Sequence, residues 1–133
     1  AIPIGFFARK SYLRRRGTPT KLAELAEHAL VGSDHERGLI AFLSAMGLEL
    51  APRDFTFRTD DDVAQLAAIR AGLGIGACQV PLGERSPELV RVLPKLTAPL
   101  EAWVVMHEDL RRVRRVRMVF DHLVRAMGEY VGA

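Results

Sequence analysis

Short apolar runs of strand-like character alternate along this chain with segments of helical periodicity. Most of the helical segments begin near a capping residue or a proline and stop at a glycine. Parallel strands need long crossover connections, which are usually helices, so this alternation predicts an α/β domain with a largely parallel sheet. The predicted strands are Ile2–Ala8, Ala29–Val31, Phe55–Arg58, Ile75–Val80 and Glu101–His107, with Leu89–Leu93 as a strand or a turn.

Start signals in the sequence place several of the helices. Thr18-Pro19 is typical of a cap followed by a first helical residue. Ser33 and Glu36 match a capping box, in which each side chain accepts a hydrogen bond from the other residue's amide. Thr59–Asp62 puts carboxylates in a first turn, where the helix dipole favours them. The predicted helices are Ser11–Arg16, Thr20–Glu27, one beginning at Ser33 and ending at Gly47, one from Thr59 to Gly72, and a long amphipathic helix carrying apolar residues from Leu110 to Val131.

The composition of the 133 residues is that of one globular domain, with 49% hydrophobic and 26% charged residues. The single cysteine, Cys78, excludes a disulfide framework and a zinc site built on paired thiolates. No segment resembles a signal peptide or is apolar for long enough to span a bilayer. We therefore expect a cytoplasmic location and no membrane partner. The chain opens at Ala1 without a methionine, which indicates a fragment.

The charge balance is mildly basic, with 19 basic and 16 acidic residues giving a net charge of +3. Many of the basic residues lie in two runs, Arg9–Arg16 and Arg111–Arg117. A solvated helix face is the ordinary interpretation of each run. A small RNA-binding module is an alternative, but only 7% of the residues are aromatic and no stacking platform is evident.

No constellation of side chains in the sequence proposes a reaction. The glycines of Gly72–Gly76 follow a helix and precede a strand, which is the reverse of a dinucleotide fingerprint. They are expected to permit a tight turn and close packing. The histidines lack the spacing of a zinc site, and Cys78 is expected to be a small buried hydrophobe rather than a nucleophile. We expect no catalytic residue, metal or cofactor, and we do not predict an enzyme.

Two predicted junctions between a strand and the following helix are candidates for ligand binding. They are Gly32–Glu36 and Thr59–Asp61. In open α/β sheets ligands bind beyond the carboxyl ends of the strands, where the first amides of the helices have no partner within the helix. The alternative is that both junctions are ordinary helix caps.

The order of these motifs resembles the effector-binding domain of LysR-type transcriptional regulators. The resemblance runs from Ala1 to the C-terminus, and it depends on the order and spacing of several motifs, each weak alone. They are Ser11-Tyr12-Leu13, Gly17-Thr18-Pro19 with Leu22 and Leu25, Asp60–Ala71 followed by Gly72-Leu73-Gly74-Ile75-Gly76, Val80-Pro81, and Leu89–Pro94.

This resemblance implies a fold like the type 2 periplasmic binding proteins, with two α/β subdomains joined by two crossing strands around a cleft. Residues 1–8 and 100–107 would be the crossing strands, about 9–94 the second subdomain, and 109–131 the C-terminal helix of the first subdomain. The family's winged helix-turn-helix DNA-binding domain has no counterpart in this sequence. Promoter DNA is therefore expected to be bound only through that other domain, and the partners would be an unknown small-molecule effector and further copies of the chain, as a dimer or tetramer.

The resemblance also implies where an effector would bind. Effector contacts in the family often come from the loop matching Gly32-Ser33-Asp34-His35, and Thr59-Asp60 lies on the same rim. Cys78 and Gln79 are second-rank candidates. Asp34 would repel a carboxylate, so it favours an effector with an amine, hydroxyl or guanidinium group, unless it turns outward as a cap. A stand-alone solute-binding protein of the same fold is the alternative function.

Overall fold

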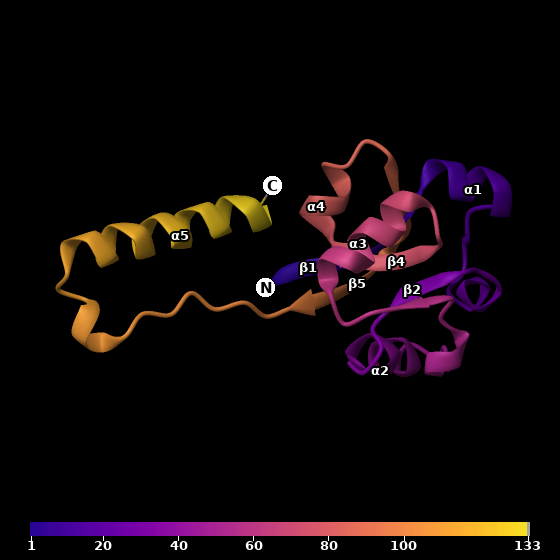
Figure 1. Ribbon diagram of the computed structural model, residues 1–133, viewed down its shortest axis with the longest axis horizontal. Coiled ribbons are helices and arrows are strands. Elements are labelled where there is room, and N and C mark those ends of the chain that lie inside the picture. Colours follow the sequence, from indigo (N-terminus) through magenta and orange to yellow (C-terminus); the bar gives the residue numbers. More distant parts are fainter. Residues whose placement is uncertain (133) are drawn as a thin grey trace.

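The computed structural model describes residues 1–132. Its strands form one five-stranded sheet in the order β3-β2-β4-β1-β5 (Figure 1). β2 is parallel to β3 and to β4, as predicted. β1 is antiparallel to both of its neighbours, β4 and β5, so the sheet is mixed rather than largely parallel as predicted. Hydrophobic runs locate strands but do not reveal that the first strand inserts between the last two. The strands are β1 (Ile2–Arg9), β2 (Leu30–Gly32), β3 (Phe57–Arg58), β4 (Ile75–Gln79) and β5 (Leu89–Leu100).

Helices cover both faces of this sheet, and since successive residues of β1 point to opposite sides, neighbouring residues belong to different cores. Phe6 belongs to a core formed with α1, η1 and α2, whereas Phe7 belongs to a second core formed with α3 and α4. Both phenylalanines are almost fully buried. The helices are α1 (Lys10–Arg16), α2 (Gly38–Ala45), α3 (Asp62–Ala71), α4 (Val80–Glu84) and α5 (Arg114–Gly132), and the 3₁₀ segments are η1 (Leu22–Glu27), η2 (Pro52–Asp54) and η3 (Glu108–Leu110).

The segment predicted as a helix over Thr20–Glu27 is instead the 3₁₀ helix η1, which begins at Leu22. Thr18 does not cap it. The carboxylate of Glu24 accepts from the Thr20 amide at 2.7 Å and from the Lys21 amide at 3.4 Å. A carboxylate binds these free amides better than a neutral hydroxyl does, which explains why the Thr18-Pro19 signal was overridden.

The glycines after α3 serve the turn and the close packing that were predicted for them. Gly72 ends α3 in the left-handed conformation with φ of 80°. A Cβ on Gly74 would lie 2.3 Å from the carbonyl oxygen of Ala29, and one on Gly76 would lie 2.6 Å from Ile69. The glycines therefore let β4 approach β2 and α3, and no phosphate-binding role is needed to explain them.

The last quarter of the chain forms an arm that leaves the sheet and returns (Figure 1). The strand predicted at Glu101–His107 is absent, because Leu100 already pairs with Ile2 and the residues after it run past the end of β1 with no strand beside them among residues 1–132. The predicted amphipathic helix is present as α5, but it begins at Arg114 rather than near Leu110, and none of its residues is buried. Trp103 and Val105 are 81% and 83% exposed. None of the helices in the described part of the chain has the length and hydropathy needed to cross a membrane.

A polar contact joins α1 to the residues just before β2. The buried Tyr12 hydroxyl lies 2.9 Å from Nδ1 of His28 and accepts from the Ala29 amide at 3.0 Å. Burial lowers the pKa of His28 below its ordinary value, and the nearby Arg16 charge lowers it further. His28 is therefore neutral at neutral pH.

This lowered pKa predicts a loss of stability in acid. Since unfolded His28 binds a proton more readily than folded His28, the stability it contributes is present above pH about 6.5 and is lost as pH falls through its folded pKa. We expect the free energy of unfolding of the wild type to fall relative to that of His28→Gln between neutral and acidic pH. Urea unfolding at several pH values measures this difference. If the free energy of unfolding of the wild type rises relative to that of His28→Gln in acid, the prediction is wrong.

Candidate functional site

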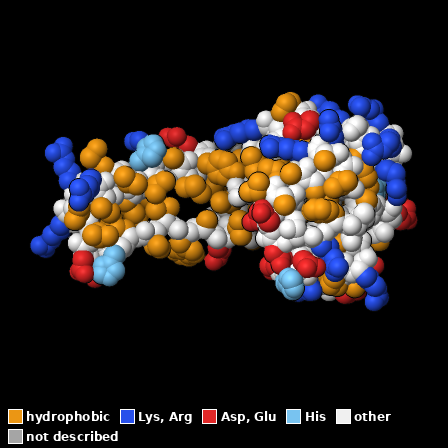
Figure 2. All heavy atoms as spheres, viewed as in Figure 1, with side chains coloured by type: hydrophobic (Ala, Val, Ile, Leu, Met, Phe, Trp, Pro, Cys, Tyr) orange, Lys and Arg blue, Asp and Glu red, His pale blue; other side chains and the backbone are white. Residues whose placement is uncertain are grey.

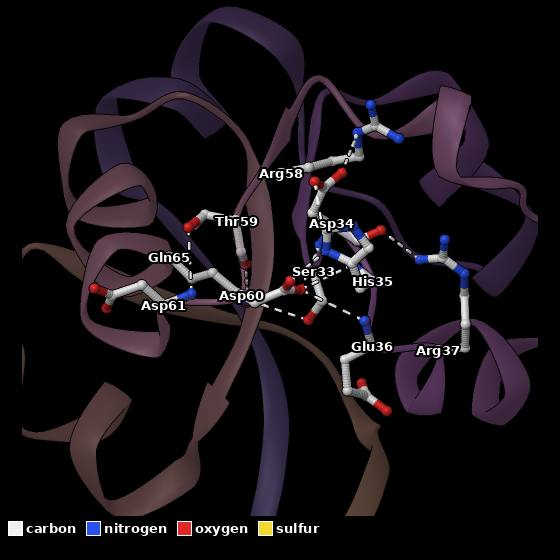
Figure 3. Close-up of polar contacts among 10 residues, drawn as sticks. All are labelled: Ser33, Asp34, His35, Glu36, Arg37, Arg58, Thr59, Asp60, Asp61 and Gln65. Carbon is white, nitrogen blue, oxygen red and sulfur yellow. Dashed lines mark hydrogen bonds and ion pairs between the residues drawn. The ribbon is translucent and has the colours of Figure 1, made fainter.

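Three parallel strands place two loops at one edge of the sheet. Gly32 of β2 pairs with Arg58 of β3, and Val31 pairs with Gly76 of β4, so the carboxyl ends of all three strands lie at the same edge. Residues 33–37 connect β2 to α2, and residues 59–61 connect β3 to α3. The sequence-predicted residues Ser33, Asp34, His35, Thr59 and Asp60 are brought together there (Figure 3).

Asp60 joins the two loops through hydrogen bonds to the backbone of the other loop. Its Oδ1 accepts from the amides of Asp34 and His35, both at 2.8 Å, and from that of Glu36 at 3.4 Å. Its Oδ2 lies 2.7 Å from Nδ1 of His35. We call this set of contacts the Asp60 clamp. The amides that an anionic ligand would need are thus already bound by a carboxylate of the protein.

The clamp shifts the pKa values of both of its ionisable partners. The hydrogen bonds from the amide and then the ring of His35 lower the pKa of Asp60 to about 2. The hydrogen bond to Asp60, and then the negative charge of Asp34, raise the pKa of His35 above its usual value. Both side chains are largely open to solvent, with exposed fractions of 83% for His35 and 45% for Asp60. The pair therefore holds loop geometry more than it stabilises the fold.

The capping box predicted from Ser33 and Glu36 is wrong. α2 begins at Gly38, whose amide donates to Oε1 of Glu36 at 2.6 Å, and the N-cap residue is Arg37, whose side chain makes no capping hydrogen bond. Ser33 Oγ instead accepts from Nε2 of Gln65 at 3.2 Å. The charged Asp60, brought in by the neighbouring strand, takes the amides for which the serine would have competed.

The second junction forms the helix start that was predicted there, and it contains residues that sequence reasoning missed. Asp61 caps α3 by accepting from the amides of Val63 and Ala64 at 2.8 and 3.0 Å. Gln65, one turn later, donates to the carbonyl of Thr59 at 2.7 Å and so ties both loops to α3. The only signal for Gln65 in the sequence was its position one turn after the cap.

Two arginines near the clamp were also missed. Nε of Arg58 lies 3.6 Å from Oδ1 of Asp34, and Arg37 donates to the Asp34 carbonyl at 2.6 Å. Arg58 is the last residue of β3, and its position next to Asp34 follows from the register of β3 against β2. Asp34 therefore has cations on two sides, while its carboxylate stays 43% exposed.

The remaining predicted residues make their contacts elsewhere. A Cβ on Gly32 would lie 2.6 Å from the ring of Phe55, so this glycine serves packing. Cys78 packs against the core of α3 and α4, and burial raises its pKa to about 11, which keeps it a thiol at neutral pH. Gln79 accepts from the hydroxyl of Tyr130 in α5 at 2.6 Å. Within residues 1–132, no three His, Cys, Asp or Glu side chains come together in a way that could hold a metal ion.

Comparison with known proteins gives the family. The sequence model of the LysR substrate binding domain matches residues 1–128. The chain belongs to this family. The resemblance noted in the sequence is thereby confirmed, together with the fold class like that of the periplasmic binding proteins. A comparison with curated proteins found no match.

Solved structures of LysR-type regulators share the fold of this LysR substrate-binding domain. The regulatory domain of CrgA from Neisseria meningitidis aligns with a TM-score of 0.74 and 24% identity, over 94% of this chain and 64% of that one. Full-length CrgA aligns with a TM-score of 0.74 and 25% identity, over 96% of this chain and 45% of that one. The regulatory domain of AphB from Vibrio vulnificus aligns with a TM-score of 0.57 and 18% identity, over 74% of this chain and 51% of that one. This chain thus spans between about half and two thirds of these regulatory domains.

Proposed function

We propose that this chain is the effector-sensing part of a LysR-type transcription regulator of the cytoplasm, and that its effector binds at the rim held by the Asp60 clamp. The observation that carries this proposal is the clamp itself, which joins two loops at the carboxyl ends of three parallel strands. Open α/β sheets bind ligands at this edge. In the proposed organisation residues 9–94 form the second subdomain, residues 1–8 and 100–107 are the two crossing segments, and α5 packs on the first subdomain.

The charges at the rim favour an effector that donates hydrogen bonds. The amides of residues 34 and 35 are already satisfied by Asp60, so they offer nothing to a ligand carboxylate. The carboxylate of Asp34 lies 3.6 Å from Nε of Arg58 and 3.7 Å from Nδ1 of His35, which is beyond hydrogen-bond distance, and it remains open to solvent. An amine, hydroxyl or guanidinium group on the effector would complete its hydrogen bonding.

In this proposal the effector acts by shifting a population. A ligand that binds the closed form of the cleft more tightly than the open form favours closure, and several kilocalories per mole of differential affinity are needed for a strong switch. Closure in a dimer or tetramer would change the relative placement of the DNA-binding domains, which lie outside this sequence. The family match supports a regulatory rather than an enzymatic role.

The assignment to a regulator is tested by the intact mass of the native gene product, captured by antibody from its source cells. This chain spans 45% of full-length CrgA, so we expect a mass about twice its 14.7 kDa or more, with a helix-turn-helix in the additional sequence. A native mass near 14.7 kDa would overturn the regulator assignment.

The effector site is tested on the native protein with a panel of small amines, guanidinium compounds and matching carboxylates. We expect a compound with a cationic donor group to raise the melting temperature of the wild type, and Asp34→Asn to weaken its binding about tenfold or more, as when a charged hydrogen bond is lost. Asp62→Asn is the matched control, since it removes the same charge in the exposed first turn of α3. If Asp34→Asn and Asp62→Asn bind equally well, Asp34 does not contact the effector.

A further inference from the structure

The charges of this chain are segregated along the sequence. Arg9–Lys21 contains six basic residues and no acidic one, and Leu110–Arg117 contains five basic residues and no acidic one. The rest of the chain carries 8 basic and 16 acidic residues. The modest net charge of +3 therefore hides two strongly positive segments. Figure 2 shows Lys and Arg side chains gathered at both ends of the long molecule, over α1 at one end and around the start of α5 at the other.

The positive surface around α1 is presented by a rigid part of the fold. Tyr12 and Leu13 bury one side of α1 in the core, and this fixes the helix against the sheet. The basic side chains lie on its exposed side and around its ends. We call them the α1 patch, which consists of Arg9, Lys10, Arg14, Arg15, Arg16 and Lys21, all exposed.

Within the described residues no carboxylate lies within ion-pair distance of the α1 patch, and Glu24, whose pKa is lowered first by a hydrogen bond from the Thr20 amide and also by the Lys21 charge, is a nearby acid. The ion pairs found among residues 1–132 involve none of its six members. Arg9 donates to the carbonyl of Arg70 at 3.0 Å and Arg16 to the carbonyl of Glu27 at 3.3 Å. These contacts with neutral carbonyl groups orient the two guanidinium groups and leave their charge unpaired.

The arrangement suits an extended polyanion better than a small one. Arg14, Arg15 and Arg16 are consecutive in a helix, so their side chains fan out by about 100° per residue and do not converge on one point. Guanidinium groups match phosphate in shape and charge, and a nucleic-acid backbone presents phosphates at regular intervals. The segment at the tip of the arm is a poorer candidate, because Arg117 is paired with Asp121 at 3.0 Å and Glu108 and Asp109 lie just before it.

We propose that the α1 patch binds the phosphate backbone of duplex DNA without reading its sequence. This contact would be additional to any DNA-binding domain outside this sequence, so it departs from the expectation that DNA is bound only through that domain, and it does not depend on the effector site. Because each phosphate contact releases a counterion, the logarithm of the binding constant must fall linearly with the logarithm of the salt concentration.

The test is the salt dependence of binding between this chain and a short fluorescent DNA duplex of arbitrary sequence, followed by anisotropy. We expect binding at low salt. The slope of the logarithm of the binding constant against the logarithm of the salt concentration should become shallower by about 0.9 for each phosphate contact removed. In the triple variant Arg14→Gln, Arg15→Gln, Arg16→Gln the change should therefore be up to about 2.7. The matched control changes Arg112, Arg114 and Arg115 to Gln, which removes the same charge at the tip of the arm. This control variant should change the slope by less than about 0.9, the value for one phosphate contact.

Several results would overturn this assignment. They are no binding at low salt, equal changes of slope in the two triple variants, or competition by poly-glutamate as strong as that by DNA, which would indicate an acidic protein as the partner. Replacing Arg14, Arg15 and Arg16 with Lys keeps the charge and must keep the slope within about one contact. Circular dichroism of each variant shows whether the fold is retained, and the lysine variant separates lost charge from lost structure.

Discussion

Alanine at position 74 is expected to destabilise this domain by at least roughly 1–3 kcal/mol, the usual cost of overpacking. A Cβ on Gly74 would lie 2.3 Å from the carbonyl oxygen of Ala29 and 2.7 Å from its carbonyl carbon. These are backbone atoms, so no side-chain rotation relieves the clash. The same carbonyl accepts from the Ile75 amide at 2.9 Å, next to the Leu30–Ile75 pair that joins β2 to β4. Moving it therefore disturbs the strand pairing at the centre of the sheet.

Gly128→Ala is the control for this prediction. Gly128 lies in α5 with no atom within 4 Å of the position of an added Cβ. Alanine is the better helix former by about 1 kcal/mol, so this variant should be as stable as the wild type or more stable. Urea unfolding of both variants, followed by circular dichroism, gives the two free energies of unfolding. Equal effects of the two substitutions would show that contact with Ala29 is not what requires glycine at position 74.

The repeating patterns of the sequence predicted most of the elements, because their causes are local. The signals for α3 lie within a few residues of one another, and they predicted a start at Thr59–Asp62 and an end at Gly72, where the structure has the cap at Asp61 and the end at Ala71. The buried pattern Ile75–Val80 likewise gave β4 to within one residue. The apolar residues of α3 do not by themselves identify its buried side, since Val63 is 78% exposed and Ala68 and Ile69 are the buried residues. Which side of a helix is buried depends on where the sheet lies, and periodicity in a short helix leaves that open.

What the sequence could not predict depends on contacts between distant residues. Asp60 accepts from amides that lie 24 to 26 positions earlier, and the register of β2 against β3 is what brings them together. From the neighbouring sequence alone, Asp60 is one of several acidic residues at a helix start, and Ser33 is predicted to cap a helix. The strand predicted at Glu101–His107 failed for a similar reason, because its apolar pattern is suited to pairing but no strand lies beside it within the described residues.

Removing the Asp60 carboxylate is expected to free the loop after β2. In Asp60→Ala the amides of Asp34 and His35 lose their acceptor and become open to water, so their hydrogen exchange should accelerate about tenfold or more. The amide of Ile75, bonded to Ala29 at 2.9 Å inside the sheet, should exchange at its wild-type rate. Asp60→Asn keeps an acceptor oxygen for the amides but loses the charge, so it should retain part of their protection.

The same variants separate the charge of the clamp from its hydrogen bonds through the titration of His35. Its pKa is raised mainly by Asp60, so we expect NMR titration to give a value above about 6.5 in the wild type and a lower value in Asp60→Asn. Because protonated His35 is the form that pairs with Asp60, the clamp is strengthened at acidic pH and weakens as pH rises through the folded pKa of His35. Asp62→Asn removes a charge from the same turn without touching His35 and should leave the titration unchanged. An unaltered His35 pKa in Asp60→Asn, together with slow exchange of the Asp34 amide in Asp60→Ala, would mean that the two loops are held together by contacts other than Asp60.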